Sequence, residues 1–227
     1  MAYTVAVIGL GNIGLLYDHQ LSEKDFVLSH TRAFSQNADF ELVGAVDPEQ
    51  GLRDRFARKH NAAAHSSIDE LLCHVQPEVF VVASPTGSHW VNVSQILKRC
   101  QPRAILCEKP LANDVATARA MVDACQNEQV SFYVNFMRRA DPGIREVEAR
   151  LRSNQIVMPF KAIVWYSKGL LHNGSHFVDL LSFWFGPISG VKAINPGRAL
   201  SEYDAEPDVQ VTFEQGSAIL CAAREEN

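Results

Sequence analysis

The feature that most constrains the fold of this chain is a glycine pattern directly after its first apolar run. Val5–Ile8 is short and β-branched, as in a buried strand, and Gly9-Leu-Gly11-Asn-Ile-Gly14 follows it. In a strand–turn–helix unit the first glycine makes the turn, the second admits a pyrophosphate, and the third lets helix and strand pack closely. The N–H groups at the helix start also favour an anion. We therefore predict a dinucleotide-binding turn that includes Asn12 and Ile13, the alternative being an ordinary strand-to-helix turn.

An acidic residue ends the second expected strand. Asp47 follows a β-branched run, and a carboxylate there can accept hydrogen bonds from the adenosine ribose. It lies farther from Gly14 than the usual spacing of about 20 residues, because Leu21–Leu28 looks like an inserted loop. Its charge would repel a 2′-phosphate, so the sequence favours NAD over NADP. Alternatively, Asp47 only starts a turn and caps the next helix.

Short β-branched runs alternate with helical patterns through the first part of the chain, as in β-α-β units of a parallel sheet. The strands are expected at Val5–Ile8, Phe40–Val46, Val79–Ala83, Ala104–Cys107 and Ser131–Val134. The helices are expected at Ile13–His19, His30–Gln36, Glu49–Lys59, Ile68–His74, His89–Lys98 and Asp114–Asn127. Ser67 and Asn113 are placed as N-caps. We predict a Rossmann-type, doubly wound α/β domain over residues 1–127.

The regular alternation of strands and helices ends after Asn135. Helices are expected at Asp141–Arg152 and His176–Phe185, and strands at Phe160–Ser167, Val191–Ile194, Asp208–Phe213 and Ala218–Ala222. The strand spacing suits antiparallel pairing. Residues 128–227 are therefore expected to form a shortened α+β domain with a mainly antiparallel sheet.

Composition excludes several classes of protein. Of the 227 residues 47% are apolar and 21% charged, which allows a full core. The net charge of −5 offers no basic face to nucleic acid or an anionic membrane, and no apolar stretch approaches the ~20 residues of a membrane span. Because Thr4–Gly9 reads as a strand that runs into a glycine turn, we expect no secretory signal there. The five cysteines include no C-x-x-C pair, so we expect a reducing, cytoplasmic location.

Four later segments, together with the glycine turn, resemble one family of two-domain dehydrogenases. They are Ala83-Ser-Pro-Thr-Gly-Ser-His89, Cys107-Glu-Lys-Pro110, Asn135-Phe-Met-Arg-Arg-Ala-Asp-Pro142 and His172-Asn-Gly-Ser-His-Phe-Val-Asp179. In this order they resemble the glucose-fructose oxidoreductase and inositol dehydrogenase family (Gfo/Idh/MocA), over the chain from the first strand to about Gly186. The last family motif commonly begins with Asp, where this chain has His172. Family members generally continue well beyond this length, so we expect a trimmed second domain or a fragment.

The resemblance implies an activity and a set of site residues. It implies an NAD-dependent oxidoreductase acting on a sugar, polyol or sugar derivative, with Lys109 at the catalytic lysine position. Beyond the glycine turn and Asp47, the implied cofactor contacts are Ser84, Pro85, Thr86, His89, Glu108, Lys109 and Asn135. The implied substrate contacts are Lys109, Arg138, Arg139, His172, Asn173 and His176. A homo-oligomer through the second-domain sheet is the expected assembly.

Oxidising a secondary alcohol requires a base close to the reacting carbon. A histidine pKa of about 6.5 suits that task better than a lysine pKa of about 10.4, so we assign His176 as the base and Lys109 to polarise the substrate oxygen. His172 completes the expected catalytic set. His172 and His176 could together ligate a metal. No third ligand is evident nearby in the sequence, so we expect no metal site.

Several of these residues have a structural alternative. Lys109 could be a solvated strand-end lysine, and His89 a helix-start histidine satisfied by backbone. Arg138 and Arg139 could form surface salt bridges instead of holding an anionic substrate group. Cys107 is expected in the core, and Trp90, Trp165 and Trp184 in the core or a pocket wall.

Two rival functions share this fold, because fold does not fix function. One is a non-catalytic NAD(H)-binding sensor or scaffold. The other is a lyase or glycosidase in which NAD is reduced and reoxidised within one cycle.

Overall fold

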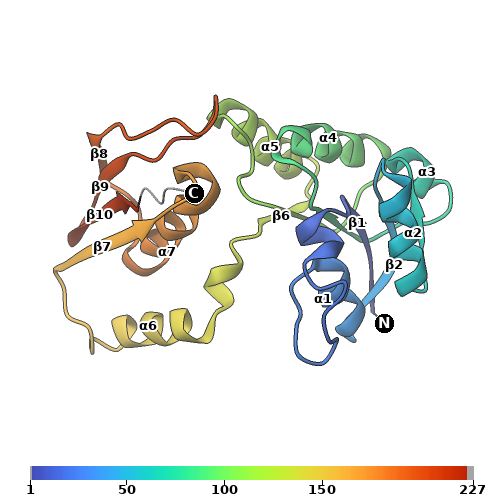
Figure 1. Ribbon diagram of the computed structural model, residues 1–227, viewed down its shortest axis with the longest axis horizontal. Coiled ribbons are helices and arrows are strands. Elements are labelled where there is room, and N and C mark those ends of the chain that lie inside the picture. The colour runs from blue at the N-terminus through green and yellow to red at the C-terminus, as the bar shows by residue number, and fades with distance from the viewer. Residues whose placement is uncertain (1, 224–227) are drawn as a thin grey trace. The chain divides into compact units, whose positions relative to one another are not determined.

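The computed structural model describes residues 2–223, which divide into two compact units (Figure 1). The first unit comprises Met1–Asn135 and the second Phe136–Asn227. The boundary therefore follows Asn135 and not residue 127 as we expected. The reason is β6 (Ser131–Val134), which pairs with β5 and so belongs to the first sheet.

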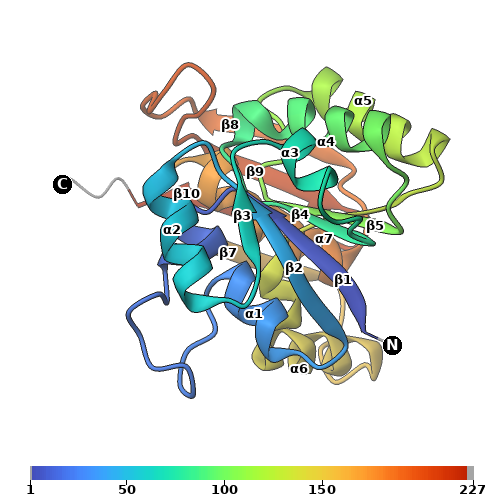
Figure 2. The same cartoon turned by 90° about the vertical axis from the view of Figure 1, so that its right-hand side faces the viewer.

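The sheet of the first unit is entirely parallel, with the order β3-β2-β1-β4-β5-β6. Besides β6, its strands are β1 (Tyr3–Ile8), β2 (Phe40–Val46), β3 (Ala63–His65), β4 (Val79–Val82) and β5 (Ala104–Cys107). Figure 2 shows β1 and β2 side by side near the middle of this sheet. The sequence did not indicate β3, because three residues are too few to show an alternating pattern.

Helices cover both faces of this sheet, which confirms the doubly wound fold. They are α1 (His30–Gln36), α2 (Gln50–Lys59), α3 (Ile68–Leu72), α4 (His89–Arg99) and α5 (Val115–Asn127). Alternate residues of β1 point to opposite faces. Val5 and Val7 lie in the cluster that includes Phe34 of α1, whereas Ala6 and Ile8 join the cluster that includes residues of α3, α4 and α5.

The helix caps were partly predicted. Ser67 caps α3 by accepting a hydrogen bond from the N–H of Glu70 at 3.2 Å. The cap of α5 is Asp114 and not Asn113, because the Asp114 carboxylate accepts from the N–H of Thr117 at 2.7 Å.

The second unit has a four-stranded sheet with the order β7-β10-β9-β8. Its elements are α6 (Pro142–Arg152), β7 (Phe160–Tyr166), α7 (Ser175–Phe185), β8 (Gly190–Asn195), β9 (Asp208–Phe213) and β10 (Gly216–Ala222). The pairs β10–β9 and β8–β9 are antiparallel and β10–β7 is parallel, so the sheet is mixed but mainly antiparallel. Leu181 and Phe185 of α7 pack on one face of it, against Val211, Phe213 and Leu220.

A search for membrane-spanning segments covered the described residues. None of their helices combines the length and the apolar character that crossing a bilayer demands.

Candidate functional site

The expected cofactor residues of the first unit follow the carboxyl ends of neighbouring parallel strands. The glycine turn follows β1, Asp47 follows β2, Ser84 follows β4, Glu108 follows β5 and Asn135 follows β6. The order of the strands reverses direction between β1 and β4. In open α/β sheets, ligands bind outside the carboxyl ends of the strands at such a switch point. The topology therefore brings these residues to one edge of the sheet.

The three glycines of the turn serve different purposes. Gly9 has a φ of +98°, and a Cβ there would lie 2.6 Å from the backbone nitrogen of Ser84. A Cβ on Gly14 would lie 2.1 Å from the carbonyl oxygen of Gly9, so this glycine lets the turn close on itself. A Cβ on Gly11 would meet no heavy atom within 4 Å. The open space beside Gly11 fits the close approach of a pyrophosphate.

The helix after the turn is shorter than expected. It is a π-helix of five residues, Asn12–Leu16, and not a regular helix over Ile13–His19. Because the helix is so short, its macrodipole adds little. What the turn offers an anion is the set of N–H groups at the first helical positions, including Asn12 and Ile13, which have no intrahelical acceptor.

Asp47 makes the turn contacts that were considered as its alternative role. Its side chain is buried, and Oδ2 accepts from the N–H of Leu10 at 2.8 Å, inside the glycine turn. Oδ1 accepts from the N–H of Glu49 at 2.9 Å, just before α2. Each carboxylate oxygen can accept a further hydrogen bond. The same side chain thus ties the turn to the sheet edge and retains capacity for a ribose hydroxyl.

The loop after β4 is braced internally. The Ser84 hydroxyl oxygen accepts from Ser88 and from Asn92, both at 2.9 Å. His89 is fully buried, with Nε2 at 2.8 Å from the Ser84 carbonyl oxygen and Nδ1 at 3.1 Å from the Leu111 carbonyl oxygen. These contacts match the alternative of a histidine satisfied by backbone. Pro85 and Thr86 lie in the same braced loop, Thr86 at the start of a 3₁₀ turn.

Glu108 lies at the centre of a buried polar network. Its Oε1 is 2.8 Å from Nε2 of His30 and accepts from the Asn135 amide at 2.6 Å, and its Oε2 accepts from the Lys109 N–H at 3.3 Å. Burial raises the pKa of Glu108, but the hydrogen bonds from His30 and Asn135 outweigh it and hold the pKa below its usual range. The network fixes the backbone from which Lys109 projects. Sequence reasoning named Glu108 and Asn135 but missed His30, whose only local feature is its place after the N-cap Ser29.

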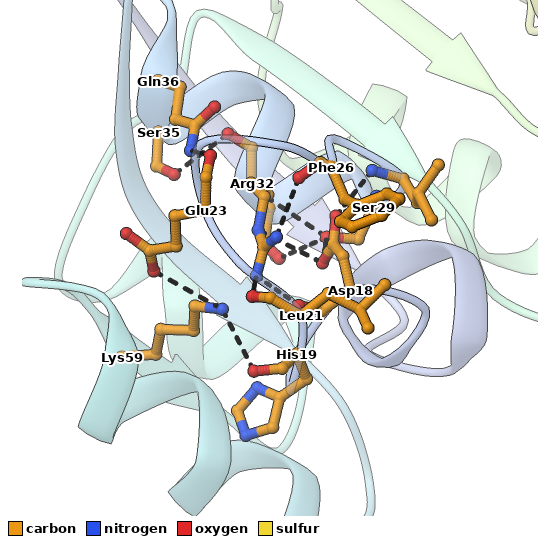
Figure 3. Close-up of polar contacts among 12 residues, drawn as sticks. Asp18, His19, Leu21, Glu23, Phe26, Ser29, Arg32, Ser35, Gln36 and Lys59 are labelled. Carbon is orange, nitrogen blue, oxygen red and sulfur yellow. Dashed lines mark hydrogen bonds and ion pairs between the residues drawn. The ribbon is translucent and has the colours of Figure 1, made fainter.

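The inserted loop before α1 is held by a second buried pair (Figure 3). Asp18 and Arg32 are 1% and 2% exposed, with 3.5 Å between Arg32 Nε and Asp18 Oδ1. The Asp18 carboxylate accepts from the Leu28 and Ser29 N–H groups at 2.6 and 2.7 Å.

The Arg32 guanidinium fixes the rest of this loop by donating to backbone carbonyls. Its acceptors are the oxygens of Asp18, Leu21, Ser22 and Phe26. The pair thereby orders the loop that leads into α1, and so sets the position of His30. Asp18 precedes the inserted loop, in a segment where the sequence predicted a helix, so nothing in the local sequence indicated this role.

The second unit carries the expected substrate residues at the start of α7. His172 and Asn173 lie in a π-helix, Leu170–Gly174, that leads into α7, where His176 is buried. The side-chain amide oxygen of Asn173 (Oδ1) accepts from Arg138 Nη2 at 3.0 Å. The Arg138 guanidinium also lies 4.8 Å from the centre of the Phe177 ring. Arg138 therefore contacts the start of α7 through Asn173 and Phe177, while His172 is exposed and His176 lies beside the Phe136 ring.

Arg139 has a different environment. It makes a two-pronged ion pair with Asp179, at 2.8 Å from Nε and 2.5 Å from Nη2. The hydrogen bond with Asp179 raises the pKa of the guanidinium. These contacts match the salt-bridge alternative for Arg139.

The cysteines and tryptophans were predicted in part. Cys107 is fully buried, and burial raises the pKa of its thiol to about 12. Trp90 packs against the core, and Trp184 donates to the Ile144 carbonyl at 3.2 Å. Trp165 is 66% exposed on β7, so its placement in a core or pocket wall was wrong. Its position alternates with the inward residues Val164 and Tyr166, which puts it on the open face of the sheet.

Comparisons with known proteins place these observations in a family. A family described as "Oxidoreductase family, NAD-binding Rossmann fold" matches residues 3–136. Myo-inositol dehydrogenase Hyg17 of Streptomyces leeuwenhoekii is 32% identical over 148 residues, covering 65% of this chain and 40% of the relative. Inositol 2-dehydrogenase of Rubrobacter xylanophilus is 28% identical over 171 residues, covering 75% of this chain and 45% of the relative. The chain thus spans less than half the length of these two curated relatives.

A solved structure shares the fold over the whole chain. The WlbA dehydrogenase from Bordetella pertussis, in complex with NADH and UDP-GlcNAcA, has a TM-score of 0.81 at 18% identity. The match covers 100% of this chain and 69% of that one. At this identity the likeness speaks for the fold alone.

Proposed function

The chain belongs to this oxidoreductase family with an NAD-binding Rossmann fold, and from that premise we propose that it is an NAD-dependent dehydrogenase acting on a sugar, polyol or sugar derivative. The observation that carries the proposal is the gathering of the glycine turn, Asp47, Ser84, Glu108 and Asn135 at one sheet edge. A polyol substrate is supported by the relatives, which are named as dehydrogenases of inositols.

The proposed cofactor contacts follow from the strand ends. The N–H groups of the glycine turn would meet the pyrophosphate beside Gly11, and Asp47 would accept from the adenosine ribose. A carboxylate at this position repels a 2′-phosphate, so we propose a preference for NAD over NADP. Pro85 and Thr86 would line the cofactor, and Glu108 and Asn135 would set the backbone at Lys109. His89 would act through the loop that it braces.

The proposed chemistry assigns a role to two side chains. His176 accepts the proton of the substrate hydroxyl, and Lys109 donates a hydrogen bond to the same oxygen. When bound, NAD⁺ would supply the hydride acceptor. Arg138 and Asn173, which are hydrogen-bonded to each other, would orient the neighbouring hydroxyls together with His172. The buried setting of His176 supports this assignment, because the atoms packed around a buried ring limit its orientations.

We further propose that the open face of the second sheet joins two copies of the chain. Ile163 and Trp165 of β7 are 69% and 66% exposed. Across the parallel ladder they pair with Ile219 and Cys221 of β10, so the four side chains share one face. Sedimentation of the unmodified protein should show a dimer, and Trp165→Lys should make it monomeric. A monomer at every concentration would contradict this assembly.

A cytoplasmic location remains part of the proposal. All five cysteines are free thiols. Unpaired thiols are typical of a reducing compartment.

Turnover and binding together test the proposed function. The protein is mixed with NAD⁺ and myo-inositol, scyllo-inositol, glucose or glucose 6-phosphate, and NADH absorbance is followed alongside the sugar products. We expect one of these alcohols to give NADH and a ketone in equal amounts. Tight NADH binding without turnover would favour the sensor or scaffold. A product without net NADH would favour the lyase or glycosidase.

A further inference from the structure

The backbone that leads into α7 is held by residues that follow it by 32 to 38 positions in sequence. One of these, Glu206, is fully buried. Its Oε1 accepts from the N–H of Lys168 at 2.8 Å, and the carboxylate also accepts from the N–H of Gly169. Arg198 donates to Oε2 at 2.7 Å. Burial raises the pKa of Glu206, but these hydrogen bonds hold it below its usual range, so the carboxylate is charged at neutral pH.

The next three N–H groups along the chain are also taken by this later segment. The carbonyl oxygen of Ala205 accepts from Leu170 at 2.8 Å. The two carboxylate oxygens of Asp204 accept separately from Leu171 and His172, both at 2.9 Å. Five consecutive N–H groups, from residue 168 to residue 172, therefore point at residues 204–206. We call these three residues the 204–206 clamp.

The held segment has a backbone that local sequence does not favour. Lys168 has a φ of +63° and Gly169 a φ of +88°, both in the left-handed region. A non-glycine residue rarely adopts this region without support from its surroundings. The fit is also tight, because a Cβ on Gly169 would lie 2.0 Å from Oδ2 of Asp204. The clamp therefore fixes a conformation that the segment would not keep by itself.

The segment that the clamp fixes carries the proposed substrate residues. His172 lies at the end of the clamped run, Asn173 follows it, and His176 comes one turn later in α7. Asn173 is further held by its amide, which donates to the Ser167 carbonyl at 3.0 Å. An error of ~1 Å in the position of such groups can cost about 10²-fold in rate.

From this arrangement, we propose that Asp204 and Glu206 are positioning residues for the substrate site, and that they hold His172, Asn173 and His176 in the geometry that a polyol requires. The inference rests on the proposed function, because it assumes that these three side chains meet the substrate. The clamp acts only on the second unit, so it should leave NAD(H) binding by the first unit unchanged.

Asp204 is the residue to vary, since it is partly exposed and its loss leaves Glu206 paired with Arg198. Asp204→Ala removes both acceptors, and Asp204→Asn retains one acceptor oxygen at the same place. Glu202→Ala is the matched control, an exposed carboxylate of the same loop. Each variant is compared with the unmodified protein by mass-spectrometric hydrogen exchange over residues 168–176, by steady-state kinetics with NAD⁺ and myo-inositol, and by NADH affinity.

We expect faster exchange over residues 168–176 and a fall in kcat/KM of about tenfold or more for Asp204→Ala. Asp204→Asn should lie between that variant and the unmodified protein, Glu202→Ala should equal the latter, and NADH affinity should stay the same throughout. Unaltered exchange in Asp204→Ala would overturn the clamp. Faster exchange with an unchanged kcat/KM would overturn its role in positioning. If the unmodified protein turns over no polyol, the proposed function fails instead, and the exchange result alone decides whether the clamp holds the backbone.

Discussion

The two units position their proposed site residues by different means. In the first unit Asp47, Glu108 and Asn135 each follow a parallel strand, so the hydrogen bonds of the sheet itself bring them together. In the second unit His172 and Asn173 lie on a short, irregular helical turn held by the 204–206 clamp. Residues at strand ends are thus placed by the topology of the sheet, whereas residues on a turn depend on individual long-range side chains.

The largest effect, a loss of NADH binding, should come from a side chain that fills the space beside Gly11. Its backbone has a φ of −67° and a ψ of −156°, which a branched residue can adopt. Gly11→Val should abolish measurable NADH binding, because the side chain occupies the proposed place of the pyrophosphate. Fluorescence titration with NADH measures this, and the melting temperature should remain unchanged.

Gly51→Val is the control for that change. A Cβ at Gly51 approaches only the Glu49 side chain, at 3.4 Å, and should leave NADH affinity intact. If Gly11→Val keeps the affinity of the unmodified protein, the loop is only a turn. The proposed pyrophosphate position beside Gly11 would then be wrong.

Removing the proposed acid–base groups should cost about 10²-fold or more in kcat, the usual scale for a positioned proton acceptor. Lys109→Ala tests the first unit and His176→Ala the second. NADH affinity should change little in either, and the double variant should be scarcely slower than the slower single variant, because both groups serve one step. Full activity in both alanine variants, on a substrate that the unmodified protein oxidises, would refute the mechanism.

The sequence predicted the strands that carry the first group of proposed site residues better than the turn that carries the second, for a physical reason. Strands such as Phe40–Val46 and Ser131–Val134 are short and rich in apolar and aromatic residues, so the residues that follow them could be assigned to the sheet edge. The His30–Glu108 contact joins residues 78 positions apart, and no local pattern encodes such a contact.

The same limit applies to the irregular segments of both units. Helical periodicity before the inserted loop predicted a regular helix, but the chain forms only five π-helical residues there. In the second unit the exposed Trp165 shows that an aromatic residue on an open sheet cannot be assigned to a core by type alone. The clamp from Asp204 was likewise invisible before the fold placed it.

Substitution of Asp47 should have a smaller effect, on the preference for NADH over NADPH. Asp47→Ala should weaken NADH binding by one to two decades, since a charge-assisted hydrogen bond contributes about 1.5–3 kcal/mol. NADPH binding should weaken less, so the gap between the two cofactors narrows. Because Asp47 also accepts from Leu10 and Glu49, Asp47→Asn is the control that keeps part of this bracing. Tighter NADPH than NADH binding by the unmodified protein would sink the assignment.

The smallest effect should be a difference between the two units in the pH at which each loses stability. Burial lowers the pKa of His60, in the first unit, to about 4 from its ordinary value of 6.5. The folded state favours neutral His60, so its contribution is full above pH 6.5 and is lost as the pH falls toward 4. Glu206, in the second unit, has a lowered carboxylate pKa, so its contribution is lost only below about pH 4.5.

The first unit should therefore weaken before the second as pH falls from 6.5 to 4.5, by a few degrees in melting temperature. Trp90 fluorescence reports the first unit in a variant with Trp165→Phe and Trp184→Phe, and Trp184 reports the second in a variant with Trp90→Phe and Trp165→Phe. His60→Phe should remove much of the loss in the first unit, because a phenylalanine ring can lie in the same tilted contact with Phe56 and does not titrate. Equal losses in both units over this range would contradict the account.

We propose that the chain moves a hydride from a carbon of a polyol to NAD⁺, and this transfer can be followed directly. The most direct measurement uses myo-inositol carrying deuterium on its ring carbons and follows the label into the reduced cofactor by mass spectrometry. We expect each molecule of inosose formed to yield one deuterated NADH, and Gly11→Val to yield none. Product formed without label in NADH, or cofactor bound with no product at all, would contradict the claim.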